Sequence, residues 1–218
     1  MPMTFAREAW PFVIPPAALA AVLFFLGHNI AGWIFAALAF GILLFFRDPR
    51  RQYDGDPDVI LAAADGLVTQ VGVVEEPDIG GEPYQRVVTF LSVFDVHVQR
   101  VPTTGEIVSS ALKRGQKVAA FRHDADEVNE AHLTVLRRPS GDLIGIKQVV
   151  GLVARRIVCY LSAGQKVERG EHLGLIKFGS RVDIFVPQSY EILVKKGDRL
   201  KNGLTPVARP AAPDEGGP

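Results

Sequence analysis

Cysteine is nearly absent from this chain of 218 residues, and so is any excess of charge of one sign. A single cysteine, Cys159, excludes an internal disulfide and a cysteine-based zinc site. Because it lies in an apolar run, we interpret it as a small buried hydrophobic residue rather than a nucleophile. Lysine plus arginine and aspartate plus glutamate number 24 each, so the composition offers no broad basic surface for nucleic acid. The five histidines lack HExxH or any other tight ligand spacing, and we therefore expect no metal cofactor.

Charge is missing altogether from residues 11–46, which contain no Asp, Glu, Lys or Arg. One helix of that length would measure about 54 Å, whereas the hydrocarbon core of a membrane is about 30 Å thick. Gly27-His28-Asn29 supplies a turn, so the sequence predicts a hairpin of two short helices, Phe12–Leu26 and Ile30–Phe46, after a lead of residues 1–10. Both helices are short for a perpendicular span, which leaves a full crossing and a shallow re-entrant hairpin open.

Positive charges flank this predicted hairpin. Arg7 precedes it, and Arg47, Arg50 and Arg51 follow it. Cations at both outer ends place both ends on the cytoplasmic side of the inner membrane, together with the rest of the chain. A removed signal peptide is the competing interpretation, but the apolar stretch is too long and no cleavage site is evident after it.

Residues 47–208 have the pattern of a mainly β domain. Short β-branched runs alternate with Gly, Pro and Asp, as in an all-β sandwich or barrel. The predicted strands are Leu67–Val74, Gln85–Leu91, Val96–Val101, Gly105–Ser109, Leu133–Leu136, Leu143–Val149, Ala154–Leu161, Leu173–Ile176, Arg181–Val186 and Glu191–Val194. Only Asp124–Ala131 suggests a helical turn, and residues 209–218 are predicted to form a disordered tail.

A weak internal repeat refines the fold class. Lys113–Val118, Ser162–Gly170 and Val194–Leu200 each contain a glycine followed by a polar residue, a cation and an aliphatic residue. Turns of this kind that lead into a strand recur in barrel-sandwich hybrid domains. We therefore expect a domain of that kind behind the helical hairpin.

Four polar clusters interrupt the apolar pattern. Asp65 precedes a glycine at a strand start, Asp95 and His97 are spaced to share one face of a strand, Asp124–His132 is a polar loop, and Gly179-Ser180 lies between strand-like residues. Each has an ordinary explanation as a turn, a structural histidine or a solvated loop. A Gly-Ser bond in such surroundings is also a candidate for self-cleavage, in which the hydroxyl attacks the preceding carbonyl and the serine becomes a pyruvoyl group.

Together the clusters resemble the phosphatidylserine decarboxylase family, in its short bacterial and archaeal form. The resemblance covers about residues 40–207 in order and spacing. The matching pieces are Phe45–Arg50, Ala64–Gly66, Leu91–His97, Arg100–Pro102, Asn129-Glu130, Gly151–Ile157 and Gly179-Ser180.

The resemblance implies a self-processing proenzyme. Cleavage before Ser180 would leave a β chain of residues 1–179 and an α chain of residues 180–218, held together as a heterodimer, alone or within a higher oligomer. The pyruvoyl group made from Ser180 would form a Schiff base with phosphatidylserine and take up electrons as CO₂ leaves, without PLP or a metal. The membrane hairpin fits this role, because a two-tailed lipid stays in the bilayer.

The group that activates Ser180 is less clear, since many longer members carry His-x-x-His where this chain reads His97-Val-Gln-Arg100. We expect His97 to serve both as the base for processing and as the acid that reprotonates the substrate carbon, with Asp65 or Asp95 orienting it. Arg155, Arg156 and Arg100 are candidates for binding the lipid phosphate, with plain surface charge an equal alternative for the Arg155-Arg156 pair.

Two other functions stay open at this point. One is a membrane-anchored adaptor without enzymatic activity that carries a lipoyl-like β domain, although no sustained heptads for the usual coiled coil are present. The other is a pyruvoyl decarboxylase of a soluble amino acid, which the hydrophobic N-terminus disfavours.

Overall fold

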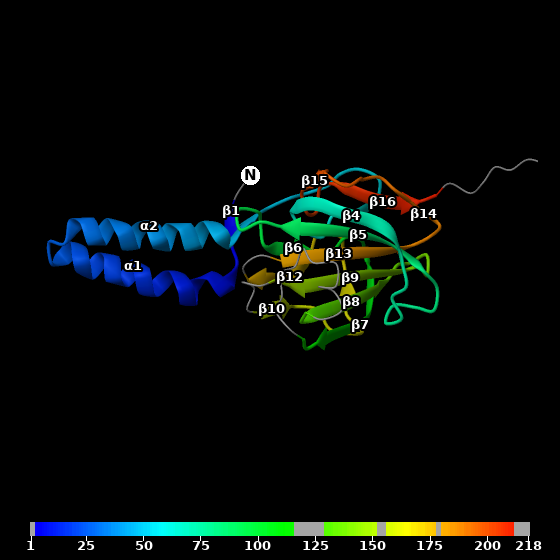
Figure 1. The fold of residues 1–218 in the computed structure, drawn as a ribbon, viewed down its shortest axis with the longest axis horizontal. Coiled ribbons are helices and arrows are strands. Elements are labelled where there is room, and N and C mark those ends of the chain that lie inside the picture. The colour runs from blue at the N-terminus through cyan, green and yellow to red at the C-terminus, as the bar shows by residue number, and fades with distance from the viewer. Residues whose placement is uncertain (1–2, 116–128, 152–155, 178–179, 212–218) are drawn as a thin grey trace, which may run out of the picture.

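A computed structural model describes residues 3–115, 129–151, 156–177 and 180–211 of the chain. Its two parts are a pair of antiparallel helices and a β domain, joined at one end of the β domain (Figure 1). A short 3-10 turn, η1 (Arg7–Ala9), leads into helix α1 (Trp10–Phe25), and α2 (Asn29–Phe45) returns to the β domain. Both helices lie within two residues of their predicted bounds, and Gly27 makes the turn between them with φ of +81°.

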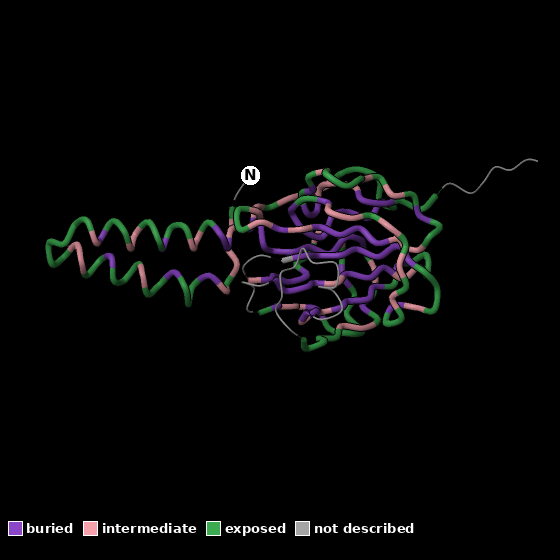
Figure 2. Tube along the Cα trace, viewed as in Figure 1, coloured by how far each residue is buried: buried purple, intermediate pink, exposed green. Residues whose placement is uncertain are grey.

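The helical hairpin projects from the β domain, and most of its residues are exposed or only partly buried (Figure 2). Phe25, close to the tip, is 90% exposed. Helices of 16 and 17 residues measure about 24 to 26 Å, slightly less than the thickness of membrane hydrocarbon. By length and composition, the continuous helical stretch Arg7–Phe25 qualifies as a candidate membrane span.

The base of the hairpin is fastened to the β domain. Strands β1 (Met3–Phe5) and β2 (Arg47–Pro49), which flank the hairpin in sequence, pair with each other. Above them, Phe45 and Phe46 pack in one apolar cluster with Leu175 of the β domain. The hairpin therefore leaves the domain from a fixed point.

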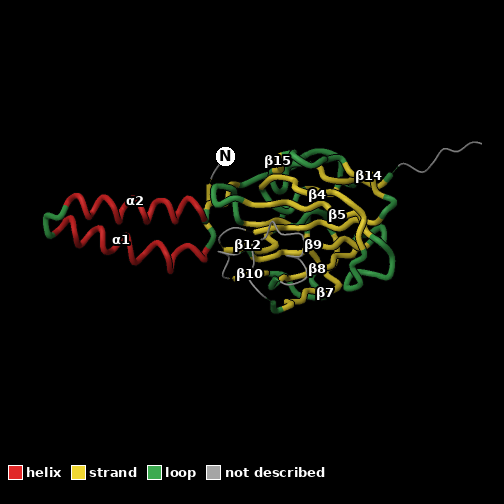
Figure 3. The backbone as a smooth tube through the Cα atoms, in the orientation of Figure 1, coloured by secondary structure: helices red, strands yellow, loops and turns green. Residues whose placement is uncertain are grey.

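Strands dominate the rest of the chain (Figure 3), and every described strand pair is antiparallel. The largest sheet contains, in order, β11 (Lys166–Val167), β7 (Gly105–Lys113), β8 (Ala131–Arg137), β9 (Leu143–Val150), β13 (Ser180–Pro187), β5 (Tyr84–Leu91), β4 (Gly66–Val74) and β15 (Arg199–Leu200). A three-stranded sheet contains β10 (Arg156–Cys159), β12 (His172–Lys177) and β6 (Val98–Arg100), and another contains β14 (Tyr190–Ile192), β16 (Pro206–Pro210) and β3 (Ile60–Leu61).

The main hydrophobic core lies against one face of the eight-stranded sheet. Alternate residues of β13, namely Val182, Ile184 and Val186, enter this core, as strand geometry requires. Phe185 points to the opposite face and packs in a smaller cluster with Ile79 and Tyr84. Both faces of β13 are thus buried, and the strand lies between β9 and β5 near the middle of the sheet.

The mainly β fold and the N-terminal hairpin are confirmed. Strands β1, β2, β3 and β16 were not predicted, because they are short and rest on pairing between distant segments rather than on an alternating pattern. Strand β16 continues to Pro210, two residues into the predicted tail, and residues 212–218 lie outside the described part. Most of the predicted helical turn at Asp124–Ala131 also lies outside it, while Ala131 begins β8.

Two of the repeated glycine turns occupy equivalent positions at the two edges of the large sheet. Gly164 and Gly197, with φ of +82° and +97°, precede the edge strands β11 and β15. Strand β11 pairs with Gly105 and β15 with Gly66. A Cβ atom on Gly66 would lie 2.2 Å from the carbonyl oxygen of Phe90. Glycine is therefore required there, and this close approach fixes Asp65 beside the end of β5.

Candidate active site

Ser180 is the first residue of β13 and lies at one end of the three central strands. Its backbone pairs with Leu91, the last residue of β5, and with Val150, the last residue of β9. Both neighbours are fully buried. Gly179 and the side chain of Ser180 lie outside the described part of the structure.

The other polar motifs meet at this same end of the sheet. His97 follows Leu91 by six positions, in the loop from β5 to β6. Asn129 donates from Nδ2 to the carbonyl oxygen of Val150 at 2.8 Å. Asp65 stands one residue before β4, whose Leu67 pairs with Phe90. The structure thus brings together segments that are up to 115 positions apart, from Asp65 to Ser180.

The imidazole of His97 is only 1% exposed and is held in one orientation. Its Nδ1 lies 2.9 Å from the main-chain oxygen of Asp95. Because a carbonyl only accepts hydrogen bonds, Nδ1 must carry the proton, and Nε2 presents a lone pair. Nε2 is buried and has no hydrogen-bond partner among the described residues. The ring of Phe45, at the end of α2, lies against the imidazole with 4.1 Å between ring centroids.

These surroundings keep His97 neutral. Burial is the largest effect and, with the positive charge of Arg47, lowers the pKa of His97 to about 4. The carbonyl and the charge of Asp95, followed by the charge of Asp65, act in the opposite direction but are outweighed. At neutral pH the residue is therefore an uncharged imidazole, and its Nε2 lone pair is not used by any described residue.

The carboxylate of Asp95 has a different set of partners. One oxygen accepts from the main-chain N and the Oγ of Ser92, at 2.8 and 2.7 Å, and the other accepts from Arg199. The side chain thus holds the β5–β6 loop closed. It is the main chain of Asp95, rather than its carboxylate, that orients His97.

Asp65 is buried and forms a bidentate ion pair with Arg51. It also accepts from the main-chain N of Asn202 at 2.8 Å. The side chain of Asn202 in turn donates to the carbonyl oxygen of Val98, the neighbour of His97. Asp65 therefore influences His97 through its charge and through the position of β6, and the two side chains form no direct hydrogen bond in the described structure.

Arg100, which closes the His97-Val-Gln-Arg100 segment, belongs to a separate group that we term the Asp48 cluster. It consists of Asp48, Arg100 and His172. Arg100 pairs with one oxygen of Asp48 and donates to the carbonyl of Gly170, while Nε2 of His172 lies 2.7 Å from the other oxygen. Although burial opposes it, these partners lower the pKa of Asp48. The cluster joins the segment after α2 to the β domain.

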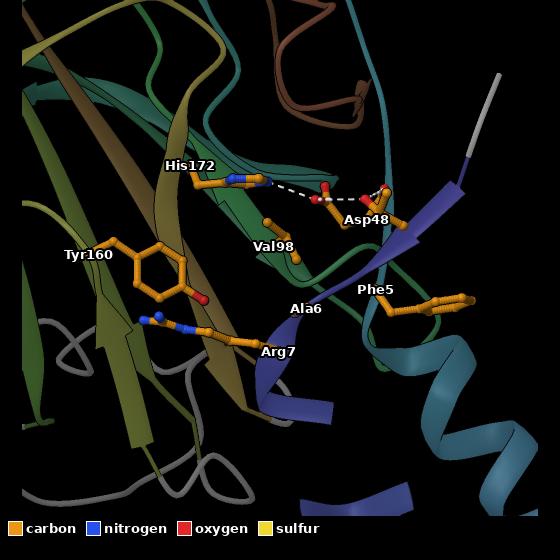
Figure 4. A pocket seen from close by; sticks show the side chains of 8 residues that line it. Phe5, Ala6, Arg7, Asp48, Val98, Tyr160 and His172 are labelled. Atoms are coloured by element: carbon orange, nitrogen blue, oxygen red, sulfur yellow. Dashed lines mark hydrogen bonds and ion pairs between the residues drawn. The ribbon is translucent and has the colours of Figure 1, made fainter. Parts of the chain in front are cut away.

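A pocket of about 440 Å³ opens beside the Asp48 cluster at the base of the hairpin. Figure 4 shows His172 reaching across to Asp48, with Tyr160 and Arg7 on the adjoining wall. The guanidinium of Arg7 lies over the Tyr160 ring, 5.1 Å from its centroid. This pocket therefore lies where the hairpin meets the β domain.

The predicted phosphate-binding arginines differ in their surroundings. Arg100 is buried in the Asp48 cluster, and Arg156, the first residue of β10, is exposed. Arg155 lies outside the described residues. In the part of the chain that the structure describes, no group of three or more His, Cys, Asp or Glu side chains is placed to hold a metal ion.

Three residues of the site were not predicted from the sequence, namely Phe45, Arg51 and Asn202. Phe45 covers the His97 ring, Arg51 pairs with Asp65, and Asn202 links Asp65 to β6. Phe45–Arg50 is one of the segments that carry the family resemblance, but nothing in its sequence assigns a role to Phe45. The sequence signal that could have identified Phe45 and Arg51 is a polar segment that directly follows an apolar helix.

Comparison with known proteins shows the family of the chain. A family model described as phosphatidylserine decarboxylase matches residues 39–208. Proteins named phosphatidylserine decarboxylase proenzyme are similar over nearly the whole chain. The one from Symbiobacterium thermophilum is 40% identical over 204 residues, covering 94% of each chain, and that from Magnetococcus marinus is 39% identical over 205 residues, again covering 94% of each. The one from Gluconacetobacter diazotrophicus is 42% identical over 207 residues, covering 92% of each.

Proposed function

Because this chain belongs to the phosphatidylserine decarboxylase family and is a phosphatidylserine decarboxylase proenzyme, we propose that it cleaves itself before Ser180 and that His97 is the base. Family membership removes the adaptor hypothesis. The observation that carries the proposal is the buried Nε2 of His97, which has no hydrogen-bond partner among the described residues. His97 lies in the loop that follows β5, the strand that pairs with Ser180.

The proton transfers of self-cleavage can be assigned to this imidazole. Nε2 takes the hydroxyl proton of Ser180 as the oxygen attacks the carbonyl carbon of Gly179. The proton passes to the Ser180 nitrogen as the peptide C–N bond breaks, which leaves an ester. Loss of the Cα proton then breaks the ester C–O bond, releases residue 179 as a carboxylate, and leaves an unsaturated residue that water converts to a pyruvoyl group and ammonia.

The described residues around Ser180 suit a pyruvoyl group. Leu91 and Val150 are buried apolar neighbours, and the Asp65 carboxylate is neutralised by Arg51. A pyruvoyl ketone there would accept the substrate amine and take up the electron pair released with CO₂. An apolar wall favours that step, because the negative charge of the carboxylate is lost.

His97 can carry the proton that decarboxylation requires. Its neutral Nε2 takes a proton from the substrate ammonium, which frees the amine to react. Because burial lowers the pKa of His97, the protonated ring is a stronger acid than an ordinary imidazolium, and it returns the proton to the substrate carbon once CO₂ has left. The hydrogen bond from Nδ1 to Asp95 keeps Nε2 aimed during both transfers.

The two fragments stay together because the α chain supplies a central strand. Strand β13 pairs along its length with β5 and over six positions with β9, both in the β chain. Val182, Ile184 and Phe185 are buried, so separating the fragments would expose much of both apolar clusters. We therefore expect a heterodimer that separates only on denaturation.

The hairpin supports a location at the cytoplasmic face of the inner membrane. Phosphatidylserine keeps its two acyl chains in the bilayer, and the uncovered apolar helices offer an anchor there. Because Phe45 at the end of α2 contacts His97, the site lies at the level of the lipid headgroups if the hairpin is inserted. Among the described arginines predicted to bind phosphate, Arg156 is exposed and Arg100 is not, which favours Arg156 for the lipid phosphate.

Replacing the cleaved residue tests the proposal. Ser180→Ala is expected to give one band on a denaturing gel, no reactive carbonyl and no decarboxylation, whereas the natural chain gives two bands. Ser189→Ala, an exposed serine in the same fragment, is the matched control and should behave like the natural chain. A Ser180→Ala protein that still splits and carries a carbonyl would contradict the assignment.

A further inference from the structure

The tip of the β5–β6 loop carries two large apolar side chains that the protein does not cover. Phe94 is 83% exposed, more than any other large apolar side chain described outside the hairpin, and its neighbour Val93 is 50% exposed. Monomeric proteins seldom leave adjacent large side chains so open unless the surface contacts something. The loop is also the one that carries His97.

This tip is tied directly to the end of the hairpin. The guanidinium of Arg47 donates from Nη1 to the carbonyl of Leu44, in the last turn of α2, and from Nη2 to the carbonyl of Phe94. Leu44 is itself an exposed apolar residue. The apolar surface of α2 therefore continues onto the loop tip at the level where the helix ends.

The loop presents these side chains in a fixed conformation. The Asp95 carboxylate accepts from the main-chain N and the Oγ of Ser92, which closes the turn around Val93 and Phe94. Arg199 holds the same carboxylate from the neighbouring edge strand. Because these hydrogen bonds close the turn at its base, the conformation of the loop itself keeps Phe94 exposed.

We propose that Val93 and Phe94 form a wedge that enters the lipid bilayer beside α2, as a membrane contact distinct from the hairpin. The inference rests on the proposed membrane residence of the hairpin. An aromatic side chain at the end of a lipid-embedded helix lies in the interfacial layer, where aromatic residues are favoured. The wedge would set the depth of the loop, so that the Asp95 carbonyl and His97 stand at the headgroup of the substrate.

Tryptophan fluorescence can locate the wedge. In a Trp10→Phe, Trp33→Phe background, Phe94→Trp provides a single emitter, and Val73→Trp is the matched control. Val73 is 59% exposed but lies toward the opposite end of β4, away from the hairpin (Figure 1). The probe is vesicles of phosphatidylcholine and phosphatidylglycerol, with and without bromine on the acyl chains. Co-sedimentation of the same samples reports binding through the hairpin.

The expected result is that vesicles shift the emission of Phe94→Trp to the blue and that brominated chains quench it, while Val73→Trp changes in neither respect. Protein that sediments with vesicles but leaves Phe94→Trp unshifted and unquenched would overturn the wedge and leave the hairpin anchor intact. Protein that fails to sediment would overturn both.

Two substitutions of Phe94 that introduce no fluorescent probe test the same surface by enzyme kinetics. Phe94→Ser removes the aromatic ring from the interface, and we expect about a tenfold loss of turnover on vesicle-borne phosphatidylserine. Phe94→Leu should restore most of it, and Val73→Ser should match the natural enzyme. Equal turnover by Phe94→Ser and the natural enzyme would contradict the wedge.

Discussion

The His97 site and the Asp48 cluster lie at the two ends of strand β6, and their buried polar groups differ in hydrogen bonding. In the cluster both oxygens of Asp48 are occupied, one by Arg100 and the other by His172. At the site an equally buried imidazole keeps Nε2 unpaired among the described residues. An unpaired buried polar atom costs about 1 to 3 kcal/mol, and at His97 this atom is the one that the proposed proton transfers use. We therefore interpret Nε2 of His97 as a group available for reaction and the Asp48 carboxylate as a group that attaches the segment after α2 to the β domain.

The largest expected effect is on the rate of self-cleavage, and it is measured by replacing His97 and His172 one at a time. His97→Gln keeps the volume but removes the base, and we expect self-cleavage to slow by about 10³-fold or more. His172→Gln can still donate to Asp48 and should be processed at nearly the natural rate. Pulse-labelled proenzyme followed on a denaturing gel measures both rates. Equal slowing of the two variants would remove the distinction between site and cluster.

Breaking the cluster should instead affect stability. Asp48→Ala leaves Arg100 buried without its partner, which costs about 3 to 5 kcal/mol for a buried pair. Thermal unfolding of the variant in a Ser180→Ala background, where processing cannot complicate the transition, measures this loss. Molecules that fold should still cleave when Ser180 is present. A stable Asp48→Ala protein that fails to cleave would show that the cluster takes part in the reaction.

The pH dependence of processing distinguishes the buried His97 from a solvated histidine. The folded pKa of about 4 is below the ordinary value of 6.5, so protonation favours the unfolded chain, and stability declines as pH falls from 6.5 toward 4. The free base persists through that range, and processing should fall only near pH 4 to 5. Phe45→Ala admits water to the His97 ring, and the pH at which processing falls should therefore rise. A fall in processing at pH 6.5 in the natural chain would contradict a buried neutral base.

The smallest effect is expected at Asp95. Because its carbonyl orients His97, Asp95→Asn keeps that contact, and its amide oxygen can still accept from Ser92. We expect less than about a tenfold change in processing, far below the 10⁴-fold loss typical when the carboxylate of a Ser-His-Asp triad is replaced by asparagine. Gel-based rates of Asp95→Asn and the natural chain decide the matter. A loss of about 10⁴-fold in the rate of processing would instead show that the Asp95 carboxylate orients His97.

Local pattern was sufficient for much of the fold. The uncharged stretch and Gly27 predicted α1 and α2 almost to the residue, since both signals are contained within a few turns of chain. The alternating runs predicted β4, β5, β9 and β13 for the same reason. Strands β1 and β2 have no such pattern, because their pairing depends on where the hairpin brings the chain back.

Motifs in the sequence identified candidate residues for the site but not the contacts between them. Asp65, His97 and Ser180 were identified from motifs, and the register of β13 with β5 brings their segments together. The partner of Asp65, Arg51, and the ring that covers His97, Phe45, come from the segment after α2. Such contacts depend on how the hairpin docks on β10 and β12, which no spacing in the sequence encodes.

Mass spectrometry of the small fragment tests the central claim most directly. The account predicts a fragment that begins at residue 180 and lacks the amino group of serine, with a carbonyl that reacts with hydroxylamine; the same fragment should be missing from Ser180→Ala and strongly reduced in His97→Gln. An intact chain from active natural enzyme, or a fragment that begins with an unmodified serine, would contradict it.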